Sequence, residues 1–486
     1  MTLRSEDSRF TSKYHSSARV RRCDGDWQEI WLRIEYEKYD PTHLTCVLSA
    51  HQLKPEDIIQ PETSECHIVA RNPVEHPITI WGINGWRSDR SEVELNVFGA
   101  DIGCTDDPLP AGEEVSVIVQ LSAGKVLEGM RGLVLNYDGT ITHYERAEAN
   151  KADKEEKVIA WEEDGVKTEA RIFYQYEDTS VAANPALLRI ACPSFRRWFK
   201  ADGTTSLSQI MDKTEEDAGD IARLLALCSR ERVRWYEIEV ETVNFKESPR
   251  LYPRAKRRGS LSHKSESSKW GDPLIDHRDL IDGGFKRLLD AYRASKYRKA
   301  LQRSISFEVS SRNNRGLDTS YAFCLMALEA LVNDLTEQAG SATTLDAQKW
   351  RKLQAELESV VMTYGDQNAL DRAVIDTILK RISELTRISL VDAVKQQVDT
   401  WGVKIDDLWP SSVGFLAGLR QSIKLRNDLF HRASTADPDL LYENLFRLRV
   451  LVERFILKVL AWPDEKIWVW HAQEVKRVNK ASESKS

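Results

Sequence analysis

The sequence predicts an α+β protein: an N-terminal antiparallel β-rich domain, of the sandwich or barrel type, followed by an all-α helical bundle. Through residues 26 to about 180, apolar side chains alternate with polar ones, as at Ile30, Leu32 and Ile34, and this is the period of a half-buried strand. From Ile281 onward, apolar residues recur at steps of three and four, which is the period of an amphipathic helix. A chain of 486 residues has room for two or three domains, so we expect the two patterns to belong to separate domains.

Short strands separated by Gly, Pro, Asp and Asn are expected throughout the β-rich part. They cover residues 30–36, 44–50, 67–70, 78–83, 93–98, 115–121, 133–137, 158–161, 166–176 and 187–192. Asp138 and Gly139 together predict a hairpin turn. A helix over 206–228 and a strand through Tyr236, Ile238 and Val240 follow. Strands at such intervals are typical of an antiparallel sandwich or barrel.

Tryptophan is frequent in this part of the chain. The residues are Trp27, Trp31, Trp81, Trp86, Trp161, Trp198 and Trp235. Tryptophans on a sheet can stack on nucleic-acid bases. Burial is the more usual fate of this side chain, so we expect most of them in the core.

The composition along the chain divides it into five segments. These are a polar N-terminal segment (1–25), a β-rich domain (26–244), a basic flexible linker (245–270), a helical domain (271–470) and a polar tail (471–486). Within the linker, residues 246–264 hold seven Lys or Arg against one acid. Its candidates for contacting RNA phosphates are Arg254, Lys256, Arg257 and Arg258. A solvated tether between domains is the alternative interpretation.

Helices are expected in the second part over residues 288–297, 322–335, 345–362, 370–386 and 390–398. Glu329 lies on the apolar side of its helix. Because an unpaired charge in an apolar setting costs several kcal/mol, Glu329 should have a cationic partner. Arg426 and His431 are the candidates, and such a pair can serve structure alone.

Residues 416–459 predict two apolar helices joined by a short loop. The first has a stripe of Leu416, Leu419, Ile423 and Phe430, and Arg426 falls on that same stripe. Asn427 and His431 are four residues apart, so they lie one turn apart on the helix. The second helix should begin with Asp437 as its cap and Pro438 in its first turn.

Arg426-Asn427-x3-His431 resembles the motif of the HEPN superfamily of helical ribonucleases, which is arginine, a polar residue, three to five others and histidine. The run from Tyr321 to Val332 looks like the long first helix of the Apea-like branch of that superfamily. The resemblance covers roughly the last 200 residues. Two further matches to the motif end at His76 and His263, but neither lies on an amphipathic helix. The first contains Pro73, and the second contains Gly259 in a polar segment.

The resemblance implies a metal-independent endoribonuclease that uses no cofactor. RNA carries its own nucleophile, the 2′-hydroxyl, so the enzyme needs a group that moves a proton and a cation that holds the phosphate. His431 suits the first task, Arg426 the second, and Asn427 can orient the imidazole or bond the substrate. The products should be a 2′,3′-cyclic phosphate and a 5′-hydroxyl. The resemblance further implies that two such sites meet in a homodimer formed through the helical domain, and that the enzyme acts in anti-phage defence by abortive infection.

Composition limits the other possibilities. The net charge of −7 requires any contact with RNA, whether tRNA or mRNA, to be local. Seven cysteines without CxxC spacing give no support for a structural zinc site. No run approaches the length of a membrane span and the N-terminus lacks a secretory pattern, so a cytoplasmic location is expected.

Two alternatives remain beside the nuclease interpretation. One is a non-catalytic helical module that acts by binding or dimerisation. The other is the toxin of a nucleotidyltransferase pair, whose motif continues to a modifiable tyrosine where this chain has Ala433. The N-terminal domain is expected to sense a ligand or a phage protein.

Overall fold

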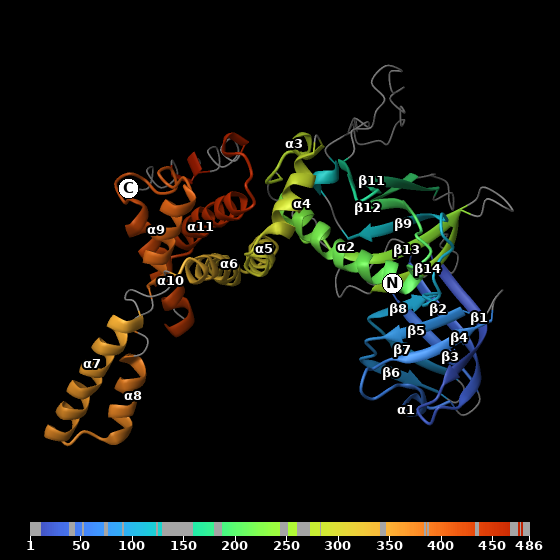
Figure 1. The fold of residues 1–486 in the computed structure, drawn as a ribbon, viewed down its shortest axis with the longest axis horizontal. Helices are drawn as coiled ribbons and strands as arrows, with labels where there is room; N and C mark the ends of the chain where they lie inside the picture. Colours follow the sequence, from blue (N-terminus) through green and yellow to red (C-terminus); the bar gives the residue numbers. More distant parts are fainter. Residues whose placement is uncertain are drawn as a thin grey trace, which may run out of the picture. The chain divides into compact units, whose positions relative to one another are not determined.

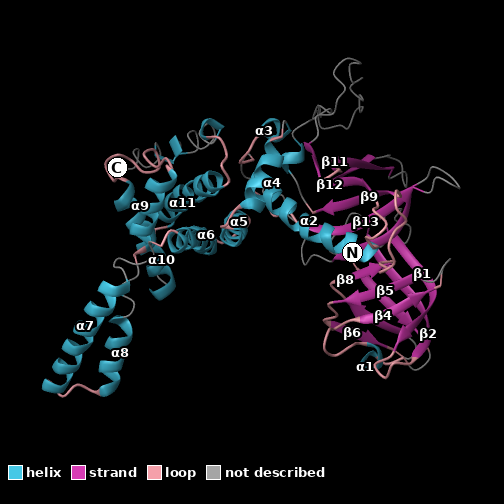
Figure 2. Ribbon diagram, viewed as in Figure 1, coloured by secondary structure: helices cyan, strands magenta, loops and turns pink. Residues whose placement is uncertain are grey.

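The computed structural model describes residues 11–37, 44–50, 53–71, 76–89, 92–122, 125–128, 159–178, 187–243, 251–259, 273–281, 283–340, 347–382, 385, 388–432, 437–466, 475–476 and 478–479. The chain divides into two compact units, residues 1–289 and 290–486. The first contains an antiparallel sheet and the second is helical, which confirms the α+β prediction (Figures 1 and 2). Within the described ranges, no helix combines the length and the apolar character that crossing a membrane requires.

The described strands of the first unit form one sheet of 14 strands. They are β1 (Thr11–Arg21), β2 (Trp27–Glu37), β3 (Thr45–Ser49), β4 (Cys66–Ala70), β5 (His76–Trp81), β6 (Gly85–Ser88), β7 (Glu92–Asn96), β8 (Gly99–Ile102), β9 (Glu114–Leu121), β10 (Ile159–Glu163), β11 (Val166–Asp178), β12 (Leu187–Lys200), β13 (Trp235–Val243) and β14 (Leu251–Gly259). Their order is β10-β11-β12-β9-β13-β14-β8-β5-β4-β1-β2-β3-β7-β6. Each neighbouring pair runs antiparallel.

Strands β1–β8 enclose a single apolar core together with the short helix α1 (Pro55–Ile58). The alternation seen in the sequence produces this arrangement, because Ile30, Leu32 and Ile34 are buried on one face of β2. Burying each such side chain stabilises the fold by roughly 2 kcal/mol. At the β5–β8 pair, Gly99 faces Trp81, and a Cβ on Gly99 would lie 2.0 Å from the indole ring. Glycine is therefore required where the indole crosses the neighbouring backbone.

Helix α2 (Leu207–Ser229) packs against β13 and β14. Ser206 caps its first turn: the Ser206 hydroxyl accepts the Gln209 N–H, and the Gln209 side chain accepts the Ser206 N–H. The apolar residues that predicted this helix are buried, including Ile210, Ile221 and Leu224. Both α2 and the predicted strand through Ile238 (β13) are confirmed.

Two segment predictions were wrong in the first unit. Residues 11–21, assigned to a polar N-terminal segment, form β1, which pairs with β2 and β4. Residues 251–259, assigned to a flexible linker, form β14 between β13 and β8. The expected strand at 133–137 and the Asp138–Gly139 turn lie outside the described residues.

The helices that follow the sheet confirm the predicted helical half. The first unit ends in α3 (His277–Ile281), and α4 (Gly284–Ala294) spans the division between the units. The second unit holds α5 (Arg298–Arg312), α6 (Leu317–Gln338), α7 (Ala347–Gln367), α8 (Arg372–Ile382), α9 (Leu390–Trp401), α10 (Phe415–Arg432) and α11 (Pro438–Val459). Helix α6 packs on α5, α9 and α11, so it is the central helix of this unit. Helix α5 lies between two expected helices, in a stretch for which the sequence pattern predicted none.

Candidate functional site

Helices α10 and α11 form the predicted pair, with the motif near the end of α10. Asp437 caps α11, its carboxylate accepting the Asp439 N–H at 3.0 Å, and Pro438 occupies the first turn. Arg426, Asn427 and His431 all belong to α10. The helical backbone therefore places Asn427 and His431 one turn apart, as their spacing predicts.

Arg426 forms a two-point ion pair with Glu329 of α6. Arg426 Nη1 lies 2.9 Å from Glu329 Oε1, and Nη2 donates to Oε2 at 3.2 Å. The pairing expected for Glu329 is thus confirmed, with Arg426 as the partner. Both side chains keep partial access to solvent, 32% for Arg426 and 26% for Glu329. A phosphate can therefore reach the guanidinium without displacing a helix.

Burial and the neighbouring positive charge shift the pKa of the Glu329 carboxyl in opposite directions. Partial burial raises its pKa, the positive charge of Arg426 lowers it, and the net direction is upward. Burial therefore costs the carboxylate more than the ion pair returns. The ionised form of Glu329 is therefore less favourable in the folded chain than in water, and Arg426 offsets part of that cost.

Asn427 is exposed at the surface of α10. It can therefore bond a substrate directly. The side chains of Phe430 and His431 lie outside the described residues, so the structure places His431 only by its position in α10.

A buried polar relay fixes α10 against α6 and α11. The Tyr321 hydroxyl of α6 donates to the Ser422 carbonyl of α10 at 2.8 Å, and burial raises the pKa of Tyr321. Ser422 Oγ lies 2.9 Å from Asn444 Oδ1 of α11, and Asn444 Nδ2 donates to the Leu440 carbonyl. Gly418 leaves space for the Trp409 ring, which a Cβ there would meet at 2.3 Å. These contacts set the rotation of α10 about its axis, and with it the direction of Arg426.

This relay was not predicted from the sequence. Tyr321 and Asn444 lie on apolar helix faces, where a polar side chain signals an internal hydrogen bond. That signal was present, but the partner could not be named because Tyr321 and Ser422 are 101 residues apart.

A second buried network joins α5 and α11. Arg312 donates to Glu308 within α5 and to Glu453 of α11, each at 2.5 Å. Arg449 of α11 donates to the Ser311 hydroxyl at 3.1 Å and also to the Ser311 carbonyl. Burial, together with the neighbouring charge of Arg312, lowers the pKa of Arg449 to about 10. Arg312, Glu308 and Glu453 are thus paired inside the bundle, and the Arg449 guanidinium is hydrogen-bonded to Ser311, which is what their burial requires.

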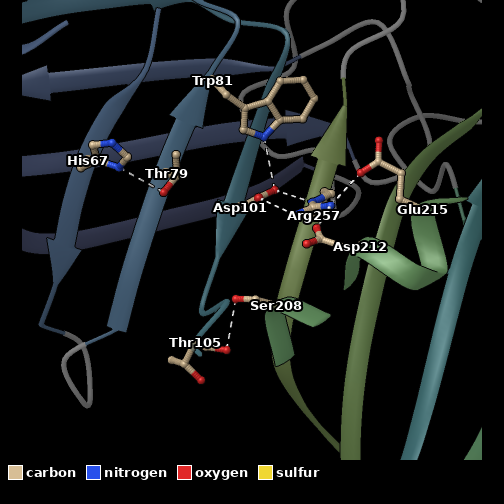
Figure 3. A network of polar contacts seen from close by, with 9 residues as sticks. All are labelled: His67, Thr79, Trp81, Asp101, Thr105, Ser208, Asp212, Glu215 and Arg257. Atoms are coloured by element: carbon tan, nitrogen blue, oxygen red, sulfur yellow. Dashed lines mark hydrogen bonds and ion pairs between the residues drawn. The ribbon is translucent and has the colours of Figure 1, made fainter. Parts of the chain in front are cut away.

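The cationic side chains described on β14 face carboxylates. Arg257 donates to Asp101 at 3.0 and 2.9 Å, to Asp212 at 2.9 Å and to Glu215 at 2.6 Å (Figure 3). Arg258 is buried and donates to Glu237 at 2.8 Å.

Lys256 of the same strand lies 3.2 Å from Glu239. The side chain of Arg254 lies outside the described residues. Lys256, Arg257 and Arg258 are therefore each paired with carboxylates of the same unit. Sequence proximity did not reveal their acidic partners, since Asp101 is 156 residues from Arg257.

The tryptophans of the sheet divide between the core and the surface. Trp161 is buried and packs on Phe285, with 5.2 Å between ring centroids. Trp27, Trp31 and Trp86 are about half exposed, so the expectation of burial was wrong for these three. Trp27 and Trp31 share the outer face of β2, where Arg19 lies over the Trp27 ring at 5.2 Å. Strand alternation explains the outcome, because both tryptophans alternate with the buried Ile30 and Leu32.

No family model, curated protein or solved structure matches this chain. Among the described side chains, no group of three or more His, Cys, Asp and Glu has an arrangement that could hold a metal ion. The site is therefore defined by its own geometry, namely an arginine held on two points beside an exposed asparagine at the end of an amphipathic helix.

Proposed function

We propose that the helical unit is a metal-independent endoribonuclease of the HEPN type, in which Arg426 holds the scissile phosphate and His431 moves a proton. The observation that carries the proposal is the two-point pair between Arg426 and Glu329. It fixes the plane of the guanidinium on the helix that carries the histidine. A fixed planar donor is what recognition of phosphate oxygens demands.

The electrostatics of the pair support a role in activity. Since the net shift of the Glu329 pKa is upward, the ionised carboxylate is held at a cost in stability. A carboxyl whose pKa is shifted by burial and by one specific charge partner is a candidate for a functional site. The acid at position 329 orients Arg426 and needs no part in proton transfer.

The chemistry requires one nucleophile, one leaving group and two proton transfers. The 2′-hydroxyl loses its proton to a base as its oxygen bonds to phosphorus. The P–O5′ bond breaks, and the departing 5′-oxygen takes a proton from an acid. The products are a 2′,3′-cyclic phosphate and a 5′-hydroxyl, and Arg426 neutralises the charge that develops on the phosphoryl oxygens.

The motif contains one histidine per chain, and this residue supplies a single proton-transfer group. We therefore propose that the active form is a homodimer through the helical domain, in which the two copies of His431 serve one as base and one as acid. Asn427 is exposed beside them and bonds the substrate or orients the imidazole. The N-terminal β-rich unit restrains or aims this nuclease in response to a ligand or a phage protein, as an abortive-infection effector in the cytoplasm requires.

Removing each motif residue tests the proposal. Arg426→Ala and His431→Ala should each abolish cleavage of a tRNA or mRNA substrate while circular dichroism stays unchanged. Arg420→Ala is the matched control for the arginine, because Arg420 lies exposed on the same helix. His76→Ala, at the second match to the motif, which contains Pro73, is the control for the histidine. Equal cleavage by wild type and both motif variants would favour a non-catalytic binding module instead.

A further inference from the structure

Exposed apolar side chains gather on the helical hairpin formed by α7 and α8. The described part of the chain has 14 large hydrophobic side chains that are exposed, and seven of them belong to α7, α8, the turn between them and the residues just after α8. They are Leu353, Val360, Tyr364, Leu370, Val374, Ile378 and Leu385. Val360 is 64% exposed and Tyr364 is 59% exposed. Single exposed hydrophobics are ordinary, but a concentration of this kind marks a contact surface.

The closest approach of the two helices fixes which way these side chains point. Gly365 of α7 lies against Ile375 of α8, since a Cβ on Gly365 would be 2.4 Å from the Ile375 side chain. In an antiparallel pair, the residues one step before two facing positions lie on the same side of the hairpin, because each step turns the helix by about 100°. Tyr364 and Val374 are those residues.

Three further side chains extend the same surface. Val360 and Ile378 lie one turn from Tyr364 and Val374, and Leu353 lies two turns beyond Val360. Leu353, Val360, Tyr364, Val374 and Ile378 therefore form one continuous surface, which we call the outer hairpin face. The opposite side of α7 presents Ala355 and Asp366, so the hairpin is amphipathic as a whole.

Charges of both signs border the outer hairpin face. Lys349 and Glu356 lie along its α7 edge, and Asp371 and Arg381 lie along α8. A surface with an apolar centre and both signs at its rim is complementary to itself under a two-fold rotation. Nucleic acid would require a rim of one sign, and this rim does not have it.

A two-fold axis parallel to α7 and α8 brings particular charges of the two copies close together. It places α7 of one copy over α8 of the other at equal height. Because Gly365 is level with Ile375, Glu356 is about 5 Å along the axis from Arg381 of the partner subunit. The two hairpins then form a four-helix bundle, which is the common way for such faces to be buried.

We infer that the outer hairpin face is the surface on which two copies of this chain meet. The inference deepens the proposed function by naming the contact surface of the dimer, and it rests on that proposal only for the need for two copies. The described side chains of α10 include no large exposed hydrophobic residue, so that helix has less apolar surface to bury. The hairpin supplies the association, and the motif helices supply the chemistry.

Analytical ultracentrifugation of the full chain tests the surface. Wild type should sediment as a dimer at micromolar concentration. In the double variant Val360→Glu/Ile378→Glu, each copy brings two carboxylates into an apolar contact. The dissociation constant should therefore rise by at least about 100-fold. Both positions are exposed, so the fold should survive, and circular dichroism checks this.

Ala355→Glu/Ala373→Glu is the matched control, because both alanines are exposed on the same two helices away from the outer hairpin face. It should remain dimeric. A monomeric wild type, a double variant that stays fully dimeric, or equal dissociation of the control would overturn the inference. Mass is measured without RNA, so loss of the proposed nuclease activity leaves this result intact, and His431→Ala should sediment as wild type.

Discussion

Arg426 and Glu329 are 97 residues apart in the chain and join α10 to α6 through two parallel contacts, at 2.9 and 3.2 Å. This pair determines where the guanidinium of the motif points. Burial raises the pKa of Glu329 more than the charge of Arg426 lowers it, so the ion pair offsets only part of the cost of burying the carboxylate.

Replacement of Glu329 by Gln separates orientation from stability. The folded pKa of Glu329 is raised above 4.5, so the proton it binds stabilises the fold below about pH 4.5. That contribution is lost as the pH rises through the folded pKa. Glu329→Gln, which mimics the protonated form, should thus be at least as stable as wild type at pH 8, and cleavage should fall about 10-fold or more. Thermal unfolding from pH 4 to pH 8 measures this, and a variant clearly less stable than wild type at pH 8 would contradict it.

Tyr321→Phe tests the hydrogen-bonded relay that fixes the orientation of α10 about its own axis. Loss of the hydrogen bond from its hydroxyl to the Ser422 carbonyl should lower the free energy of unfolding by about 1 kcal/mol. Tyr442→Phe is the control, because Tyr442 is exposed on α11 and should change stability by less than about 0.5 kcal/mol. Urea denaturation measures the free energy of unfolding of both variants. Equal effects would show that the Tyr321–Ser422 hydrogen bond contributes no more to stability than an exposed hydroxyl does.

Arg257→Ala tests whether the strand β14 cations belong to the fold or to an RNA surface. The substitution leaves Asp101, Asp212 and Glu215 close together without their shared cation. The free energy of unfolding should fall by about 3 kcal/mol, with RNA affinity unchanged in the fraction that stays folded. A stable variant with weakened RNA binding would restore the phosphate-contact interpretation.

Much of the architecture follows from periodicity in the sequence. The alternation at Ile30, Leu32 and Ile34 predicts β2, and the helical stripes predict α2, α6 and α11. Strand β1 was not predicted because two of its three described buried side chains, Ser16 and Ala18, are small, and only Val20 is a larger apolar residue. Periodicity detects large apolar residues and has little to detect there.

The remaining errors have a different physical origin. Strand β14 looks like a linker because its charges are neutralised by residues distant in sequence, such as Asp101 for Arg257. In the site, the Glu329–Arg426 pair could be predicted because a charge on an apolar stripe needs a partner. The relay through Tyr321 could not, because hydroxyl–carbonyl bonds depend on the rotation of each packed helix.

Deletion of residues 1–269, which removes the whole described sheet of the first unit, tests the proposed restraint. Residues 270–486 should be more toxic to a host cell than the full chain, because a nuclease released from its regulator acts without a signal. Growth curves and RNA integrity measure this, with His431→Ala in the same fragment as the control. A fragment that folds, dimerises and cleaves more weakly than the full chain would indicate that the β-rich unit supplies RNA affinity instead.

The chemistry of the cut RNA ends is the most direct test of the account. The full-length wild-type chain, incubated with RNA in the presence of a metal chelator, should leave 2′,3′-cyclic phosphates and 5′-hydroxyls, and His431→Ala should leave the RNA intact. Ends with a 5′-phosphate and a 3′-hydroxyl, or cleavage by His431→Ala at the wild-type rate, would contradict the assignment of Arg426 and His431 as the catalytic pair.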